Sequence, residues 1–213
     1  GDYRDEKLLA DALNGVDVVF HSLSASVPAT SNANPSDDIE NNLLGTVKLL
    51  DQMVKSEVKR IIFLSSGGAV YGNPAKTPVA ETEPTNPLSS YAITKVAIED
   101  YLLLYEKLHG LRPLIFRPSN VYGPRHGHIG VQGLITTSLS EALHGRPLKI
   151  WGDGTAIRDY LYIDDFIELC VLGLKSNETG IFNAGAGNGH CVLEIIDVIS
   201  QTLGKKVEVI FGK

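Results

Sequence analysis

The chain has 213 residues and a net charge of −6, with 43% hydrophobic and 21% charged residues. This composition is typical of a globular protein with room for one domain and part of a second. The acidic balance argues against a nucleic-acid partner, and no apolar run approaches ~18 residues, so we expect no membrane partner. We expect a cytoplasmic protein, because no signal peptide is visible and Cys170 and Cys191 lie in apolar stretches as reduced, buried side chains.

Predicted helices and strands alternate in the first part of the chain. Buried strands are short apolar runs, and helices show apolar residues every three to four positions. A Gly- and Pro-rich loop is expected over 67–87. The alternation predicts an α/β fold with a Rossmann-like, doubly wound parallel sheet. The predicted elements are a helix at 4–13, a strand at 15–21, a helix at 37–56, a strand at 58–66, a helix from about 89 to 109 and a strand at 111–118.

The pattern changes after Pro124, where the elements become shorter and mixed. Asp164 and Asp165 precede an apolar helical run and are expected to cap it. We therefore predict a Rossmann-like domain over 1–124 and a smaller mixed α/β region over 125–213, with strands that return to the sheet. Its predicted elements are helices at 134–145, 164–174 and 193–203, and strands at 147–151, 159–163, 180–185 and 205–210.

Small, polar or Gly-rich loops follow three of the predicted strands. They read SLSASVP after the strand at 15–21, SSGGAVYG after that at 58–66, and SNVYGP after that at 111–118. Ligands of open parallel sheets bind beyond the carboxyl ends of the strands. The three loops therefore indicate one ligand-binding crevice.

Tyr91 and Lys95 stand four residues apart on a predicted helix between two of these loops. Side chains at this spacing share one helix face and can reach the same point. A free phenol has a pKa of about 10, and a nearby ammonium or oxidised nicotinamide ring favours its ionised form. A tyrosine four residues before a lysine is common by chance. Their position between ligand-binding loops favours an acid/base pair directed at a cofactor.

In this order the motifs resemble the extended short-chain dehydrogenase/reductase family. The similarity is greatest to the nucleotide-sugar epimerases and dehydratases typified by UDP-galactose 4-epimerase, and it runs essentially from end to end. It implies NAD as cofactor, with NADP not excluded, a nucleotide-sugar substrate and a homodimer. The matching segments are GDYRD (1–5), NNLLGT (41–46), SSGGAVYG (65–72), YAITK (91–95), RPSNVYGP (117–124) and GDGTAIRDYLYIDD (152–165).

The resemblance also implies roles for individual residues. Tyr91 would exchange the proton, while Lys95 would bind the nicotinamide ribose and lower the pKa of the phenol. Ser119 would lie near the nicotinamide. The implied cofactor-binding residues are Asp2, Tyr3, Asn41, Ser65, Tyr91, Lys95 and Pro118, and the implied substrate-binding residues are Gly67, Asn120 and Arg158.

The chain departs from the family in three respects, one of which is Ser22-Leu23-Ser24 in place of the usual apolar-Ala-Ala/Gly after the strand at 15–21. Counted back from the VYG sequence, the catalytic Ser or Thr of the family falls on Gly67, which has no hydroxyl. Ser66 is the alternative catalytic hydroxyl, unless Tyr91 acts alone or Ser65 and Ser66 only end the strand. The Gly-rich pyrophosphate turn is also absent. We therefore expect a fragment that lacks the N-terminal Gly-rich segment and the extreme C-terminus.

The loop after the second buried strand helps to predict the reaction. Sugar-nucleotide dehydratases of the family carry an Asp-Glu pair directly after the catalytic Thr, where this chain has Gly68 and Ala69. We therefore predict epimerisation at C4 of a UDP-hexose through transient oxidation. A keto-sugar reductase, a dehydratase and a non-catalytic dinucleotide-binding relative remain alternatives. We expect no metal, because His126 and His128 lack further ligands, and His21 is expected in the core.

Overall fold

A computed structural model describes residues 5–126 and 133–212, so Asp2, Tyr3 and His128 lie outside the described residues. The chain divides into two compact units. Unit 1 comprises Gly1–Pro118 and Leu169–Ala184, and unit 2 comprises Ser119–Glu168 and Gly185–Lys213. The division follows residue 118, where we predicted 124, and a later segment rejoins unit 1.

Unit 1 is built on a four-stranded parallel sheet with the order β1-β2-β3-β7. Its strands are β1 (Val18–His21), β2 (Arg60–Leu64), β3 (Arg112–Pro118) and β7 (Gly180–Ala184). The register places Phe63 beside Ile115, and Ile115 beside Ile181. The predicted α/β, Rossmann-like parallel sheet is confirmed.

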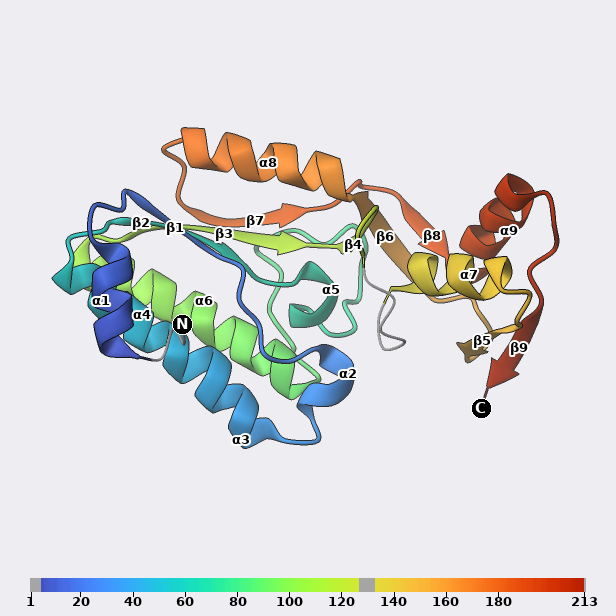
Figure 1. The fold of residues 1–213 in the computed structure, drawn as a ribbon, viewed down its shortest axis with the longest axis horizontal. Coiled ribbons are helices and arrows are strands. Elements are labelled where there is room, and N and C mark those ends of the chain that lie inside the picture. Colours follow the sequence, from blue (N-terminus) through green and yellow to red (C-terminus); the bar gives the residue numbers. More distant parts are fainter. Residues whose placement is uncertain (1–4, 127–132, 213) are drawn as a thin grey trace. The chain divides into compact units, whose positions relative to one another are not determined.

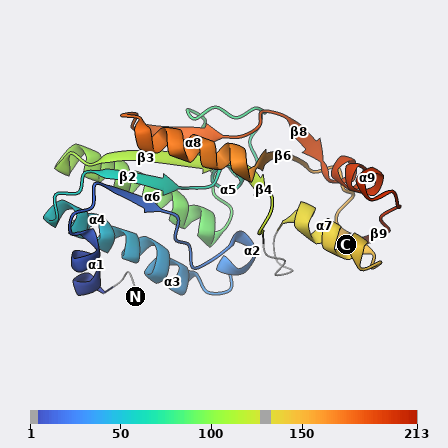
Figure 2. The same cartoon turned by 45° about the horizontal axis from the view of Figure 1, so that its top comes forward.

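Helices cover both faces of this sheet (Figures 1 and 2). On one face α1 (Glu6–Leu13), α4 (Gly45–Lys55) and α6 (Ser90–His109) enclose a core that includes Phe63 and Ile115. On the other face, residues 169–175 of α8 (Ile163–Lys175) pack against Leu114 and Phe116, whose side chains lie close to Gly173. The central strands are therefore buried on both faces, which explains their continuous apolar sequences.

Several elements of unit 1 differ from the prediction. The helix expected at 37–56 consists of α3 (Pro35–Asp38), a π-helical turn η1 (Ile39–Leu44) and α4. A π-turn adds one residue to the helical repeat and so shifts which side chains face inward. Two short helices, α2 (Pro28–Ser31) and α5 (Gly67–Val70), were not predicted, and α5 occupies the start of the expected loop.

Unit 2 contains a three-stranded sheet with the order β4-β6-β8 and a separate pair of parallel strands. In the three-stranded sheet β4 runs parallel to β6, and β8 antiparallel to it. Two helices pack against the parallel pair around Leu148, Ile150, Ile196 and Ile199. The elements are β4 (Asn120–Tyr122), α7 (Leu134–Leu143), β5 (Leu148–Trp151), β6 (Ile157–Tyr162), β8 (Gly189–Cys191), α9 (Val192–Leu203) and β9 (Val209–Gly212).

Two expectations for this part of the chain are corrected. Asp164 and Asp165 lie inside the first turn of α8, which begins at Ile163, and so are not its caps. Cys170 is buried as expected, but Cys191 is only partly buried. Its sulfur accepts a hydrogen bond from the backbone of Glu194, because Cys191 is the N-cap of α9.

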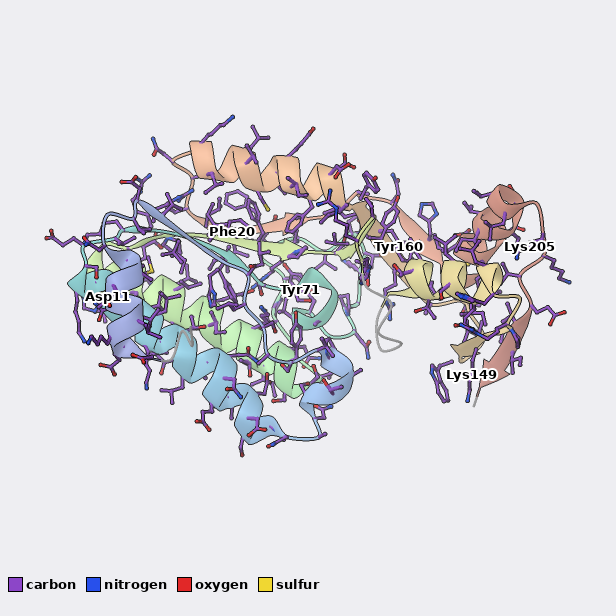
Figure 3. The ribbon with its side chains drawn as sticks, in the orientation of Figure 1. Asp11, Phe20, Tyr71, Lys149, Tyr160 and Lys205 are labelled. Carbon is purple, nitrogen blue, oxygen red and sulfur yellow. The ribbon has the colours of Figure 1, made fainter. Side chains whose placement is uncertain are left out.

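A buried ion pair joins α6 to the central strand β3. Arg117 and Glu99 are 4% and 2% exposed, and their two hydrogen bonds measure 3.0 and 2.5 Å. Arg117 also donates to the hydroxyl of Tyr71, which donates to Asn183 of β7 at 2.8 Å (Figure 3 labels Tyr71). Ser65 donates to the same carboxylate. These hydrogen bonds thus join α6, β3, β7 and the segment from Ser65 to Tyr71.

We expect Glu99→Gln to lower the free energy of unfolding of the chain by about 3–5 kcal/mol, because it leaves the Arg117 charge buried without its partner. Urea denaturation followed by circular dichroism measures this loss. The control is Glu141→Gln, which breaks the exposed pair with Arg146 and should cost less than about 1 kcal/mol. Equal losses in the two variants would contradict the structural role of the buried pair.

Candidate active site

Helix α6 positions Tyr91 and Lys95 at the carboxyl end of the sheet in unit 1. Its N-cap is Ser89, whose hydroxyl accepts a hydrogen bond from the backbone of Ala92 at 3.3 Å. The helix ends at Gly110, whose φ of 66° suits a glycine C-cap. Tyr91 therefore lies in the first turn and Lys95 one turn later, on the same face of the helix.

Lys95 is a buried cation, with 5% of its surface exposed. Its ammonium donates to the carbonyl of Leu64, at the end of β2, over 2.8 Å and lies 4.7 Å from the centre of the Phe63 ring. Burial lowers the pKa of Lys95 to about 8, although the Glu99 and Asp38 carboxylates act to raise it. Near neutral pH the Lys95 ammonium is therefore a charged hydrogen-bond donor, and it loses its proton as the pH rises through about 8.

The surroundings of Tyr91 differ from the expectation. Burial raises the pKa of the phenol, the hydrogen bond from Ser66 lowers it, and the Asp38 carboxylate raises it further. The Lys95 ammonium lies over the ring, 5.6 Å from its centre, and donates elsewhere. In the chain without cofactor, burial and a nearby carboxylate therefore determine the direction of this shift, and the expected effect of Lys95 on the phenol stays a prediction.

The two serines after β2 have different partners. Ser66 is the N-cap residue of α5, but its side chain makes no capping bond within the described chain and instead lies near Tyr91, whose pKa it lowers. Ser65 is 4% exposed, and its hydroxyl is directed at Glu99. The geometry therefore provides the hydroxyl beside Tyr91 from Ser66, and it uses the side chain of Ser65 within the core.

Gly67 fills a position with no room for a side chain. A Cβ atom there would lie 2.7 Å from the carbonyl oxygen of Arg117 and 3.2 Å from that of Pro118. The missing side chain lets α5 approach the end of β3, where Pro118 pairs with Ala184. Gly67 is thus required by packing, which explains why the hydroxyl is found one position earlier.

Of the two asparagines in η1, Asn42 is the one that faces inward. Asn42 is 7% exposed; its side-chain oxygen accepts from the backbone of Ala25 at 2.8 Å, and its amide donates to Asp38 at 2.6 Å. The amide of Asn41 donates to the backbone carbonyl of Asp37. Asn42, which was not predicted, therefore holds the loop that follows β1, and the expected role of Asn41 at the cofactor stays a prediction.

In unit 2, Asp159 holds Ser119, expected near the nicotinamide, and Asn120, expected at the substrate. Its carboxylate accepts from the hydroxyl of Ser119 at 2.9 Å and from the backbone of Gly187 at 2.8 Å, and its carbonyl accepts from the amide of Asn120 at 3.1 Å. The side chain of Arg158 is exposed and donates to the carbonyl of Ile157. This guanidinium is therefore open to an anion from solvent.

The remaining candidate features are His21, a metal site and a membrane-spanning helix. His21 is 3% exposed and lies 2.8 Å from the hydroxyl of Thr46, and burial lowers its pKa to about 4, so it is a neutral core residue as expected. Within residues 5–126 and 133–212 no group of His, Cys, Asp and Glu is arranged to hold a metal. No helix in the described part of the chain is long and apolar enough to cross a membrane.

Three charged residues around the site were not predicted. Arg117 had a signal in the sequence, because it interrupts the apolar run LIFRP, and Glu99 follows Lys95 by one helical turn. Asp38 had none, because it lies in a polar stretch. All three are buried, with 2–4% of their surface exposed.

We expect that Gly67→Ser, which places a hydroxyl at the catalytic Ser/Thr position of the family, lowers both stability and activity. Its Cβ would clash with the backbone carbonyl of Arg117, and such overpacking costs about 1–3 kcal/mol. The control is Gly68→Ser, because a Cβ at Gly68 meets nothing within 4 Å. Thermal unfolding and turnover of both variants test this; a gain of activity in Gly67→Ser would contradict it.

Comparisons with known proteins agree with this geometry. The sequence model of the NAD dependent epimerase/dehydratase family matches residues 1–185. A Methanocaldococcus jannaschii protein, provisionally named a UDP-glucose 4-epimerase, is 39% identical over 215 residues, which cover 100% of this chain and 70% of that protein.

Solved structures give the same result. A UDP-glucose 4-epimerase from Thermotoga maritima with UDP-glucose superposes with a TM-score of 0.95 at 32% identity, covering 100% of this chain and 70% of that one. A dTDP-glucose 4,6-dehydratase from Streptomyces venezuelae with NAD superposes with a TM-score of 0.89 at 31% identity, covering 100% and 66%. This chain thus spans about two thirds of the length of these proteins. It belongs to the NAD-dependent epimerase/dehydratase family of enzymes.

Proposed function

We propose that the protein is an NAD-dependent 4-epimerase of a nucleotide sugar of the UDP-hexose class. The observation that carries the proposal is the grouping of Ser66, Tyr91 and Lys95 at the ends of β2 and α6. The similarity to UDP-glucose 4-epimerases supports the substrate class.

The donor set fits a dinucleotide. An ammonium has three N–H donors, and among the described residues the carbonyl of Leu64 is the one hydrogen-bond acceptor of Lys95. Two donors are therefore left for ribose hydroxyls. Bound NAD would accept a hydride from C4 of the sugar and return it. Pro118, Asn41 and the backbone of the Ser65–Ser66 loop complete the proposed cofactor site in the described chain, and Asp2 and Tyr3 are proposed at the adenine.

Tyr91 would carry the proton. Its phenolate oxygen would take the proton of the C4 hydroxyl as the C4 hydrogen leaves, and would return it once the hydride is back on the opposite face of the sugar. The Ser66 hydrogen bond favours the ionised phenol. The Lys95 ammonium, one turn away, would add positive charge beside it when the cofactor is bound. The proton and the hydride both return to the sugar, so the reaction is an isomerisation without net oxidation.

We propose that Arg158 and Asn120 bind the diphosphate of the substrate. The planar guanidinium matches phosphate oxygens with paired donors, and the Arg158 side chain is exposed. Asp159 holds Asn120 through its backbone carbonyl. Arg158 is therefore the candidate for binding the charge of the diphosphate, and Asn120 is the candidate for orienting it.

Dehydration remains an alternative, because a 4,6-dehydratase is among the similar structures. Removing water from the sugar needs a second acid and base. Gly68 and Ala69 of α5, next to Ser66, provide neither. Epimerisation is therefore favoured. A keto-sugar reductase would consume NAD(P)H in proportion to product, and a non-catalytic relative would bind NAD without turnover.

A homodimer and a cytoplasmic location are further parts of the proposal. Leu104 and Leu108 of α6 are 44% and 64% exposed, and Ile93 on the same helix is 57% exposed. Leu102 is fully buried, so it belongs to the core and not to a dimer surface. The cysteines of the chain are both free thiols, which suits a reducing compartment.

In the complete protein, Tyr91→Phe should lower turnover of UDP-galactose to UDP-glucose by ~10²–10⁴-fold, the usual contribution of a general acid/base. NAD binding, measured by calorimetry, should persist because the ring remains. Tyr101→Phe, on the exposed side of the same helix, is the matched control. Undiminished turnover in Tyr91→Phe would contradict the proposed mechanism.

The lowered pKa of Lys95, about 8, gives a sign for the pH dependence. The charged ammonium is the active form, so kcat/KM should fall as the pH rises through about 8. Lys95→Arg keeps the charge at high pH and should move this fall upward. An unchanged descending limb in the Arg variant would assign the fall to another group.

The lowered pKa of Lys95 also affects the free energy of unfolding. The folded pKa of Lys95 lies below the ordinary 10.5, so the unfolded chain binds more protons between about 8 and 10.5. The contribution of Lys95 to the free energy of unfolding therefore rises with pH across that window, and Lys95→Met should lose this rise.

A further inference from the structure

Asp38, the last residue of α3, is a buried carboxylate with four hydrogen-bond donors. It is 2% exposed. One oxygen accepts from the hydroxyl of Ser26 at 2.5 Å and from the amide of Asn42 at 2.6 Å. The other accepts from the hydroxyls of Ser90 at 2.7 Å and Thr94 at 3.0 Å. Both lone-pair sites of each oxygen are therefore used.

The donors come from the segments that would have to keep their places in the active site. Ser26 lies in the loop after β1, and Asn42 lies in η1 and also holds that loop at Ala25. Ser90 and Thr94 lie in α6, each directly before one member of the Tyr91/Lys95 pair. One carboxylate thus joins the start of α6 to the loop at the carboxyl end of β1.

We propose that Asp38 is a positioning residue that fixes the first turn of α6, with Tyr91 and Lys95, against the loop after β1. The inference rests on the proposed function for its catalytic meaning, but the network itself is a property of the fold. None of the four donors carries a charge, so the carboxylate keeps its own.

The charge of Asp38 acts on the site as well as its hydrogen bonds. Burial raises the pKa of Asp38, but the bonds from Ser26, Ser90, Asn42 and Thr94 outweigh it and hold that pKa below its usual value, so the group is ionised at neutral pH. In the described chain no lysine or arginine forms an ion pair with Asp38. Its carboxylate raises the pKa of Lys95 and so helps to keep the ammonium charged.

Three other titratable groups face Lys95. Glu99, one turn later on α6, also raises the pKa of Lys95, but it is paired with Arg117. His21 of β1 is neutral, because burial lowers its pKa to about 4. In the chain without cofactor, Tyr91 is uncharged near neutral pH, because burial raises its pKa. Asp38 is therefore the carboxylate near Lys95 that is not shared with an arginine.

The test is the pH dependence of acetylation of Lys95, followed by mass spectrometry in Asp38→Asn and in the parent protein. Only the unprotonated amine reacts, so Asp38→Asn should shift the Lys95 profile to lower pH, below its value of about 8. The matched control is Asp37→Asn, the same change at an exposed neighbouring position, which should leave the profile in place. This measurement needs neither substrate nor turnover.

Turnover provides the second readout. Asp38→Asn should lower kcat by about 10- to 100-fold, the effect of losing hydrogen bonds to a charged group, with KM for the nucleotide sugar changed far less. Superimposable Lys95 profiles in Asp38→Asn and Asp37→Asn would overturn the proposal. A shifted profile in a protein whose parent form turns over no nucleotide sugar would instead retain the positioning role and refute the proposed function.

If Asp38→Asn does not fold, a second pair of variants decides. Thr94→Val removes one donor and keeps the shape, whereas Thr94→Ser keeps the hydroxyl. We expect a lower kcat and a displaced Lys95 profile in the valine variant, and values close to the parent in the serine variant. Identical kcat and identical profiles in the two variants would overturn the proposal.

Discussion

The buried ammonium of Lys95 is the charge on which the interior of unit 1 depends. Taking a cation out of water is costly unless hydrogen-bond acceptors and opposite charges replace the lost hydration. The carbonyl of Leu64 accepts one hydrogen bond, and the Glu99 and Asp38 carboxylates favour the charged form, so the pKa falls only to about 8. The end of β2, the start of α6 and the end of α3 are held together by this requirement.

The two carboxylates near Lys95 do different work. Glu99 is tied to Arg117 of β3, and the pair links helix to sheet inside the core. Asp38 has only neutral donors, and these join α6 to the loop after β1. One acid thus stabilises the fold, and the other holds the geometry of the candidate site.

Much of this arrangement could be predicted from the sequence. The parallel sheet follows from apolar strands that alternate with amphipathic helices, and the importance of Tyr91 and Lys95 follows from their spacing between strand-end loops. Two features near the site depend on constraints that the sequence does not show. The π-turn determines that Asn42 faces inward, and the close approach to Arg117 determines that Gly67 must lack a side chain. Neither constraint produces a periodic pattern of apolar residues in the sequence, so neither could be predicted from it.

Asp38 could not be found in this way for a different reason. Its α6 partners, Ser90 and Thr94, are 52 and 56 residues away in the chain. A polar side chain in a polar segment looks exposed until the fold shows what covers it. Long-range satisfaction of a buried charge is a property of the packed structure.

The most direct test of the central claim is the fate of a deuterium atom at C4 of UDP-galactose during turnover by the complete protein. Epimerisation at this site returns both the hydride and the proton to the sugar. We expect UDP-glucose that still carries deuterium at C4, with no net accumulation of NADH. Loss of the label to solvent, or NADH formed in proportion to product, would contradict it.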